Sequence, residues 1–532
     1  MKTDMQWKPD AFTRALIEGL FEPAEQEKHQ LTDRENEAFH ALLQKAWETN
    51  RTRPIVDLFV FLQKMKREKG LDPPALDPAA GLEEAALLLL AEKHESIDEH
   101  GVTIGGRVDR SLSIVGQAEK RCADYLNRHP VEAPSGIELR DAIAENQKRI
   151  RSVLKMGSED WDSFSGQLKF AIESIDTLSR ILDLPEKAVA DIRRVTRRYR
   201  MRLTPYYTSL IMPGEVNDPI LLQSVPTGEM VDNAGEEIPP VAADHSPARL
   251  IDQFYPRVVT IKATNMCGMY CTHCLRIAHI GKKDRIYSKD AYREALDYIR
   301  ENHSIRDVLV TGGDAFVLPN DLLKWLLQEL DEIDHVRLKR LGSRIPVTTP
   351  QRIDEALLDI LEQSSDRKPL RVVTQINTAR EITPVSRDAF RKLSNRVAAI
   401  LNQAVLLRGI NDTRVKMWKL SETIQEAYVR PYYVFNCSYR NPQFAHLRVP
   451  VETGRDIIES MYGNISGDAI PRYIATAGGK IPLHRDNVTG REGEQLVLQK
   501  PWSGETVLYP DPREEDRAGK PFAFEKYVIP EN

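Results

Sequence analysis

The chain has 532 residues, of which 29% are charged, and its formal net charge is −5. This length is enough for roughly two to four domains and a large core, and the slight acidic excess argues against general binding to nucleic acids or membrane surfaces. The most apolar stretches, 56–62 and 85–91, are too short to span a bilayer, and the N-terminus has no apolar signal core. Five cysteines, three of them clustered, argue against a disulfide framework. We therefore expect a cytoplasmic protein without nucleic-acid or membrane partners.

Residues 1–135 are predicted to form a helical N-terminal domain of unknown role. Turn clusters such as Asp72-Pro73-Pro74 separate its helices, and none of its residues has catalytic spacing. The segment 130–136 contains two prolines and a glycine and is predicted to be a linker.

Residues 136–250 form a second helical segment. Apolar side chains recur at helical spacing between Leu168 and Leu182, which predicts a helix that Pro185 ends. The next predicted helix leads into a run of arginines between Arg193 and Arg202. Guanidinium groups bind phosphates well, so a nucleic-acid patch is one interpretation. The same helix also has an apolar stripe, which favours the arginines as its solvated or interdomain face.

From 251 to 450 the pattern changes to alternating strands and amphipathic helices, including one that Ser288 is predicted to cap and one that Asn320 is predicted to cap. Right-handed βα units in this order predict an α/β fold with a partial (β/α)6 barrel that is open on one side. Residues 451–532 form a C-terminal extension with a predicted hairpin of 496–498 and 506–509. The candidate strands of the barrel are 258–264, 307–312, 336–342, 370–376, 398–407 and 430–437.

Three cysteines, Cys267, Cys271 and Cys274, follow the first of these strands. Barrel enzymes place their chemistry in such loops, at the C-terminal ends of the strands. Three thiolates can hold a four-iron cluster at three corners and leave one iron open. A structural zinc site normally needs four ligands, and His273 as the fourth would be strained. The C-x3-C-x2-C spacing is the signature of enzymes that cleave S-adenosylmethionine (SAM) to begin radical chemistry.

Two glycine-rich turns are further candidates. Gly312-Gly313-Asp314 ends the second strand, where a SAM-cleaving enzyme would hold the ammonium group of SAM. Gly478-Gly479-Lys480 lies beyond the sixth strand, where a lysine amine can react with an aldehyde cofactor. Each motif by itself is more typical of an ordinary turn.

Between Glu159 and Pro482 the chain resembles the lysine 2,3-aminomutase family, whose members are radical SAM enzymes that depend on pyridoxal 5′-phosphate (PLP). The N-terminal domain lies outside this resemblance. The matching stretches occur in the family's order and are Glu159-Asp160-Trp161, Leu203-Thr204-Pro205-Tyr206-Tyr207, Asn217-Asp218-Pro219, 267–274, 307–314, 342–347, Pro350-Gln351-Arg352, Asn402-Gln403, 406–409, Arg430-Pro431-Tyr432-Tyr433 and 478–480.

The resemblance implies a radical isomerase that moves the α-amino group of an amino acid to carbon 3 and gives a β-amino acid. It implies a 4Fe-4S cluster on the three cysteines, whose open iron binds SAM, and an electron donor such as flavodoxin or ferredoxin. It also implies a homo-oligomer. The SAM-pocket residues that it suggests are Gly312, Gly313, Asp314, Arg344 and Gln403.

The resemblance further implies that Lys480 holds PLP covalently. Tyr255 and Arg257 match the family's contacts to the PLP phosphate, although their local spacing is altered. Arg276 matches the arginine that clamps the substrate carboxylate, a task that suits a bidentate guanidinium.

The residues for the substrate side chain depart from the family pattern. Lysine-specific members place aspartates where this chain has Ser438 and 475–477, Ala-Thr-Ala. A buried ammonium without a carboxylate partner would cost several kcal/mol, so we expect a substrate other than lysine. Arg440 and Arg472 are near in sequence and could receive an acidic side chain, whereas Ser438 and Thr476 could line a small neutral pocket.

Three alternatives to this prediction stay open at this point. The chain could be a lysine 2,3-aminomutase proper, or a radical SAM enzyme of the same family that acts without PLP on another substrate. It could also be a non-catalytic interaction protein in which the cysteines bind zinc, although Lys480 and Gly312-Gly313-Asp314 argue against that.

Overall fold

The computed structural model describes residues 104–234, 246–281, 283–515 and 520–528. The predictions for residues 1–103 of the N-terminal domain lie outside the described residues. The chain divides into two compact units between Ala123 and Asp124. Helix α5 (Ile104–Glu132) crosses this boundary and contains Pro130, so the segment predicted to be a linker begins within a helix. Among the described helices, none is long and apolar enough to cross a membrane.

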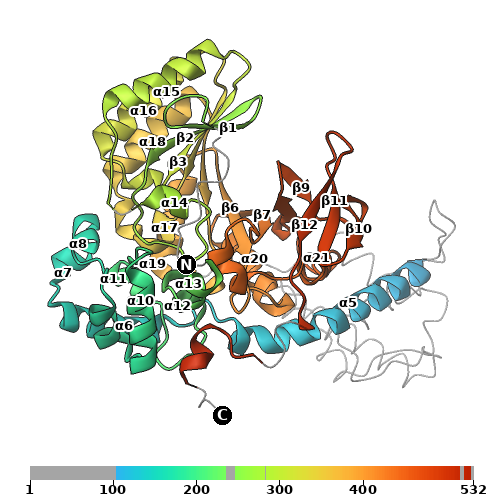
Figure 1. The fold of residues 1–532 in the computed structure, drawn as a ribbon. Coiled ribbons are helices and arrows are strands. Elements are labelled where there is room, and N and C mark those ends of the chain that lie inside the picture. The colour runs from blue at the N-terminus through green and yellow to red at the C-terminus, as the bar shows by residue number, and fades with distance from the viewer. Residues whose placement is uncertain (1–103, 235–245, 282, 516–519, 529–532) are drawn as a thin grey trace, which may run out of the picture. The chain divides into compact units, whose positions relative to one another are not determined.

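The larger unit is built on a curled nine-stranded sheet that forms a partial barrel (Figure 1). Strands β2 to β8 are parallel neighbours, and β1 and β9 are antiparallel strands at the two edges. All six predicted strands are present, and β8 is a further parallel strand that the sequence did not predict. The strands are β1 Ile251–Tyr255, β2 Val258–Thr264, β3 Asp307–Gly312, β4 Leu338–Gly342, β5 Leu370–Thr374, β6 Ala399–Leu406, β7 Arg430–Asn436, β8 Arg472–Thr476 and β9 Lys480–Pro482.

The helices between the strands cover the outer face of the sheet, as right-handed crossovers require (Figure 1). Strand residues on this face, such as Val308, Leu341 and Val372, are completely buried. Residues on the inner face are half-buried and more polar. Both predicted helices are present, and Ser288 is the N-cap of α15 as predicted. The predicted cap of α16 is wrong, because Pro319 is its N-cap and Asn320 is already its first helical residue. These helices are α15 Lys289–Glu301, α16 Asn320–Asp331, α18 Glu355–Arg367, α19 Pro384–Ser394, α20 Arg414–Glu426 and α21 Val451–Glu459.

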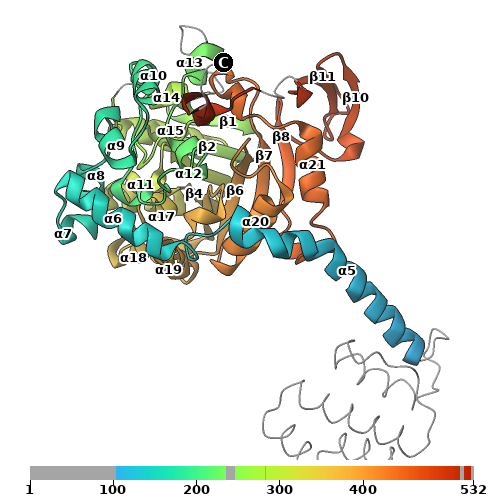
Figure 2. The same ribbon diagram turned by 90° about the horizontal axis from the view of Figure 1, so that it is seen from below.

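A helical segment precedes the sheet. The helix predicted between residues 168 and 182 is instead two helices, because Ile172 pairs through its backbone with Leu203. In α10 the apolar stripe is buried, which confirms the amphipathic prediction. Seen from below, α6, α11 and α12 lie over one end of the sheet (Figure 2). The helices are α6 Arg140–Leu154, α7 Ser158–Trp161, α8 Phe164–Lys169, α9 Ile175–Leu182, α10 Glu186–Thr196, α11 Pro205–Thr208, α12 Pro219–Ser224 and α13 Glu229–Ala234.

The C-terminal extension carries a small antiparallel sheet of β10 (Val488–Glu492), β11 (Gln495–Gln499) and β12 (Thr506–Pro510). The predicted hairpin is confirmed as β11 and β12, with Leu496 opposite Tyr509. Tyr509 donates a hydrogen bond to Asn436 at the end of β7, with 2.5 Å between the oxygens. The extension is therefore anchored on the barrel.

Candidate active site

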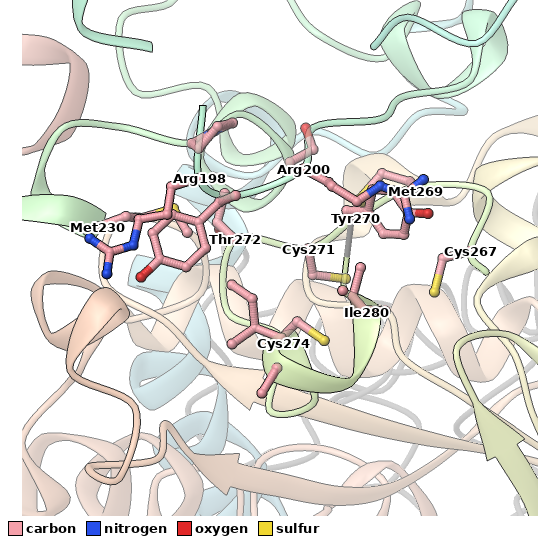
Figure 3. Close-up of a pocket in the computed structure, with 16 residues that line it drawn as sticks. Arg198, Arg200, Met230, Cys267, Met269, Tyr270, Cys271, Thr272, Cys274 and Ile280 are labelled. Carbon is pink, nitrogen blue, oxygen red and sulfur yellow. The ribbon is translucent and has the colours of Figure 1, made fainter. Parts of the chain in front are cut away.

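The three cysteines lie on the loop that leaves β2, and all three line one pocket (Figure 3). Asn265 closes this loop from within. Its amide nitrogen donates to the carbonyls of Ile280 and Lys283, each at 2.9 Å, and its amide oxygen accepts from the Arg285 amide at 2.7 Å. The two ends of the loop are thus held together, which keeps the cysteines in one place.

Two of the three thiols, those of Cys267 and Cys274, lie in an environment that disfavours their charged form. Burial raises the pKa of the Cys267 thiol, and the Asp314 carboxylate raises it further. Burial also raises the pKa of the Cys274 thiol to about 12. Such thiols ionise when they coordinate a metal. Arg344 donates to the Cys271 sulfur over 2.8 Å.

The three cysteine side chains do not converge on one point among the described residues. Within the described ranges, no group of three or more Cys, His, Asp and Glu side chains is arranged to hold one ion. The Nε2 atom of His273 lies 3.3 Å from the amide nitrogen of Asn377 and 3.4 Å from Gln375 Oε1, whereas its Nδ1 atom is buried without a hydrogen-bond partner among the described residues. Burial lowers the pKa of His273 to about 3, so the ring stays neutral. In a four-iron cluster each cysteine binds a different iron, which three separated thiols in one pocket can satisfy.

The Gly312-Gly313-Asp314 turn packs directly against the start of the cysteine loop. The Gly313 amide donates to the Thr264 carbonyl at 2.5 Å, and the Asp314 amide donates to the Met266 carbonyl at 2.8 Å. A Cβ on Gly313 would lie 2.1 Å from the Met266 carbonyl oxygen. The glycine is therefore needed for close packing against the protein's own backbone, whereas the sequence predicted a close approach to a ligand. The predicted contact of this turn with SAM stays a prediction.

Arg344 stands at the centre of a buried polar network. Its guanidinium donates to Glu381 at 2.6 Å and to Gln223 at 3.0 Å, besides the Cys271 sulfur. Glu381 is completely buried and also accepts from the hydroxyl of Tyr207 at 3.0 Å. The network joins the loops after β2, β4 and β5 to the helical segment. Sequence reasoning missed Glu381, because nothing in its neighbourhood distinguishes it from a surface glutamate.

Lys480 begins β9, at one edge of the curled sheet. Its backbone amide donates to the hydroxyl of Tyr255 on β1, the opposite edge, at 3.1 Å. Its ammonium group lies 4.8 Å from the ring centre of Tyr433 on β7. Burial lowers the pKa of Lys480, and the nearby Arg340 lowers it further. The amine is thus more available as a neutral nucleophile than an ordinary lysine.

The small sheet of β10, β11 and β12 covers the turn that carries this lysine. Gly478 and Gly479 have φ of +71° and +145°, which side chains on L-residues rarely adopt. A Cβ on Gly479 would lie 2.5 Å from the indole of Trp502, in the turn between β11 and β12. The indole therefore packs directly on the peptide before Lys480. The sequence did not predict this contact.

The other predicted site residues are more dispersed. Gln403 is half-buried on β6 beside Tyr433, and Arg276 is half-buried just after the last cysteine. Arg257 is exposed at the start of β2. Arg472 begins β8, whereas Arg440 follows the far end of the neighbouring β7, so these two arginines do not form one pocket.

The chain is thus an α/β partial barrel. It carries a three-cysteine loop after β2 and, at the edge of the curled sheet, a lysine of lowered pKa. No family model matches the chain. Over 405 residues the chain is 38% identical to the glutamate 2,3-aminomutase of Clostridioides difficile (strain 630). The aligned region covers 75% of this chain and 94% of that protein. The chain is 36% identical to the L-lysine 2,3-aminomutase of Methanococcus maripaludis, over 66% of this chain and 82% of that protein. It is 34% identical to the L-lysine 2,3-aminomutase of Clostridium subterminale, over 69% of this chain and 88% of that protein. The chain belongs to the lysine 2,3-aminomutase family, as the resemblance predicted.

Proposed function

We propose that the protein is a radical SAM, PLP-dependent 2,3-aminomutase that converts an α-amino acid other than lysine into a β-amino acid. The observation that carries this proposal is the placement of Lys480. Its amine has a lowered pKa and lies against Tyr433, on the same curled sheet as the cysteine loop. A lysine that reacts with an aldehyde cofactor needs such a neutral amine.

The residues present fit the three cofactors of the family. Cys267, Cys271 and Cys274 would hold the 4Fe-4S cluster, and Tyr255, beside Lys480, would contact PLP. When bound, these groups supply a radical that removes hydrogen from the substrate and a ring that stabilises the migrating nitrogen. The further assignments remain proposals: Gly312, Gly313, Asp314, Arg344 and Gln403 for SAM, Arg257 for PLP, and Arg276 for the substrate carboxylate.

The chain's own residues would position the reacting groups and exclude water. Lys480 would bind the cofactor aldehyde through its neutral amine, and Tyr255 would fix the lysine backbone. Trp502 covers the preceding peptide and would limit the access of water from that side. An electron donor such as flavodoxin or ferredoxin, and a homo-oligomeric state, remain part of the proposal.

The proposed substrate is an acidic or small neutral amino acid. Ser438 and Thr476 supply no negative charge at the positions where lysine-specific members of the family have aspartates. A glutamate 2,3-aminomutase is among the relatives that the chain matches, at 38% identity.

Two variants test the proposed function together. Anaerobically purified protein should contain about four irons per chain, and Cys271→Ser should lose most of them. Lys480→Ala should lose the PLP adduct that borohydride traps in the wild type but keep its iron. Lys500→Ala is the matched control, because the Lys500 amine would lie 4.0 Å from a Cβ on Gly478, in the same turn. A Lys480→Ala protein that still traps PLP, or a colourless wild type with one zinc, would contradict the proposal.

A further inference from the structure

Two arginines lie side by side on the inner face of the partial barrel. On β4, Arg340 lies between Lys339 and Leu341, which are completely buried toward the helices. On β5, Arg371 lies between Leu370 and Val372, which are also completely buried. Because side chains alternate along a strand, both arginines face the barrel interior. The strand register places Arg340 directly opposite Arg371.

Only one of these two cations has a carboxylate partner in the described part of the chain. Arg340 donates to Asp307 at 2.7 Å, and both side chains are largely buried. Arg371 forms no ion pair with any described carboxylate, and its Nε atom is buried without a hydrogen-bond partner. A guanidinium keeps its charge in proteins, and neighbouring strands are only about 4.8 Å apart. The barrel interior therefore holds an excess positive charge.

The Arg340–Asp307 pair, which lies beside Arg371 on the neighbouring strand, is close to Lys480. The charges of Arg340 and Asp307 both act on the Lys480 amine, in opposite directions. Arg340 and Arg472 also both act on Tyr432, the ring beside Tyr433. One polar region of the interior thus joins the lysine to the arginine pair.

We propose that Arg371, supported by Arg340, binds an anionic oxygen group of the ligand that is held at Lys480. This group is either the phosphate of PLP or the side-chain carboxylate of an acidic amino acid. The proposal rests on the proposed function and names a residue that the family resemblance did not. A guanidinium binds both groups in a bidentate manner, and such a ligand would satisfy the buried Nε and neutralise the pair.

The test compares full-length wild type with Arg371→Gln, which removes the charge with little change in length. Arg337→Gln is the control, since Arg337 is exposed just before β4. Titrations with PLP and with pyridoxal, which lacks the phosphate, are followed by absorbance. A charged hydrogen bond of the usual strength predicts about tenfold to a hundredfold weaker binding in Arg371→Gln. If Arg371→Gln binds PLP more weakly than the wild type but binds pyridoxal equally well, the group that Arg371 binds is the phosphate.

Unchanged PLP affinity, with weaker binding of glutamate but not of alanine to the PLP-loaded protein, assigns the side-chain carboxylate. Arg371→Lys should restore part of the lost affinity. If PLP, pyridoxal and glutamate all bind Arg371→Gln as they bind the wild type, the proposal is wrong and Arg371 is merely solvated in the open barrel. A wild type that fails to trap PLP refutes the proposed function instead. In that case the anion site is tested by the rise in melting temperature that inorganic phosphate or glutarate causes. A larger rise in the wild type than in Arg371→Gln supports the site. An equal rise in the two proteins overturns it.

Discussion

Replacing Glu381 by glutamine should destabilise the protein strongly. Glu381 is completely buried, and its carboxylate accepts from Arg344 at 2.6 Å and from the Asn377 amide at 2.7 Å. Removing one partner of a buried ion pair leaves an uncompensated charge and typically costs about 3–5 kcal/mol. Glutamine keeps the size of the side chain, so the loss reports the charge rather than a cavity.

The assay is urea-induced unfolding followed by tryptophan fluorescence under anaerobic conditions. Glu332→Gln is the matched control, because Glu332 pairs with Arg367 at 2.8 Å while the two side chains are 73% and 57% exposed. Exposed pairs contribute about 0–1 kcal/mol, so the control should unfold almost like the wild type. If Glu381→Gln loses no more free energy of unfolding than the control, the buried network does not stabilise the loops as inferred.

Three further predictions concern Lys480 and the ends of the barrel unit. The rate at which Lys480 reacts with pyridoxal should rise with pH and level off below the pH range of ordinary lysines, since burial lowers its pKa; a profile like that of free lysine would contradict the buried amine. Gly479→Ala should weaken PLP trapping, because its Cβ would clash with Trp502. Gly504→Ala is the control: its Cβ would meet open space, and its φ of +74° should cost only backbone strain of about 1 kcal/mol. Equal PLP trapping by the two variants would refute the contact between Gly479 and Trp502. A chain that begins at Asp124 should keep the iron content and melting temperature of the full chain. A chain that begins at Gly136 should melt at a lower temperature, because it loses the α5 residues that pack on α20. Equal melting temperatures of the two shortened chains would place the boundary at the predicted linker.

The strands of the barrel could be predicted because most are short runs rich in β-branched residues that alternate with amphipathic helical segments. Strand β2, with its β-branched run, matches its predicted bounds. Strand β8 was missed because it is short, follows a proline and begins with the exposed Arg472. Its place in the sheet depends on pairing with β7, which a single sequence does not specify.

The local motifs of the candidate site could be selected from the sequence, but the contacts between them could not. The cysteine spacing and the glycine-lysine turn are local patterns, so Cys267 and Lys480 could be selected from the sequence. The pairing of Arg344 with Glu381, and of Lys480 with Tyr255, joins residues that are far apart along the chain. Such contacts arise only when the sheet curls and its loops meet at one end.

The central claim is tested most directly by anaerobic incubation of the protein with single amino acids, SAM, PLP and a strong reductant. Mass spectrometry and chromatography detect the β-amino products. We predict that an acidic or small neutral amino acid is converted, that lysine is a poor substrate, and that the activity is lost in Lys480→Ala and Cys271→Ser. Efficient conversion of lysine to β-lysine would contradict the assignment of substrate, and product formation that survives Lys480→Ala would contradict the proposed site.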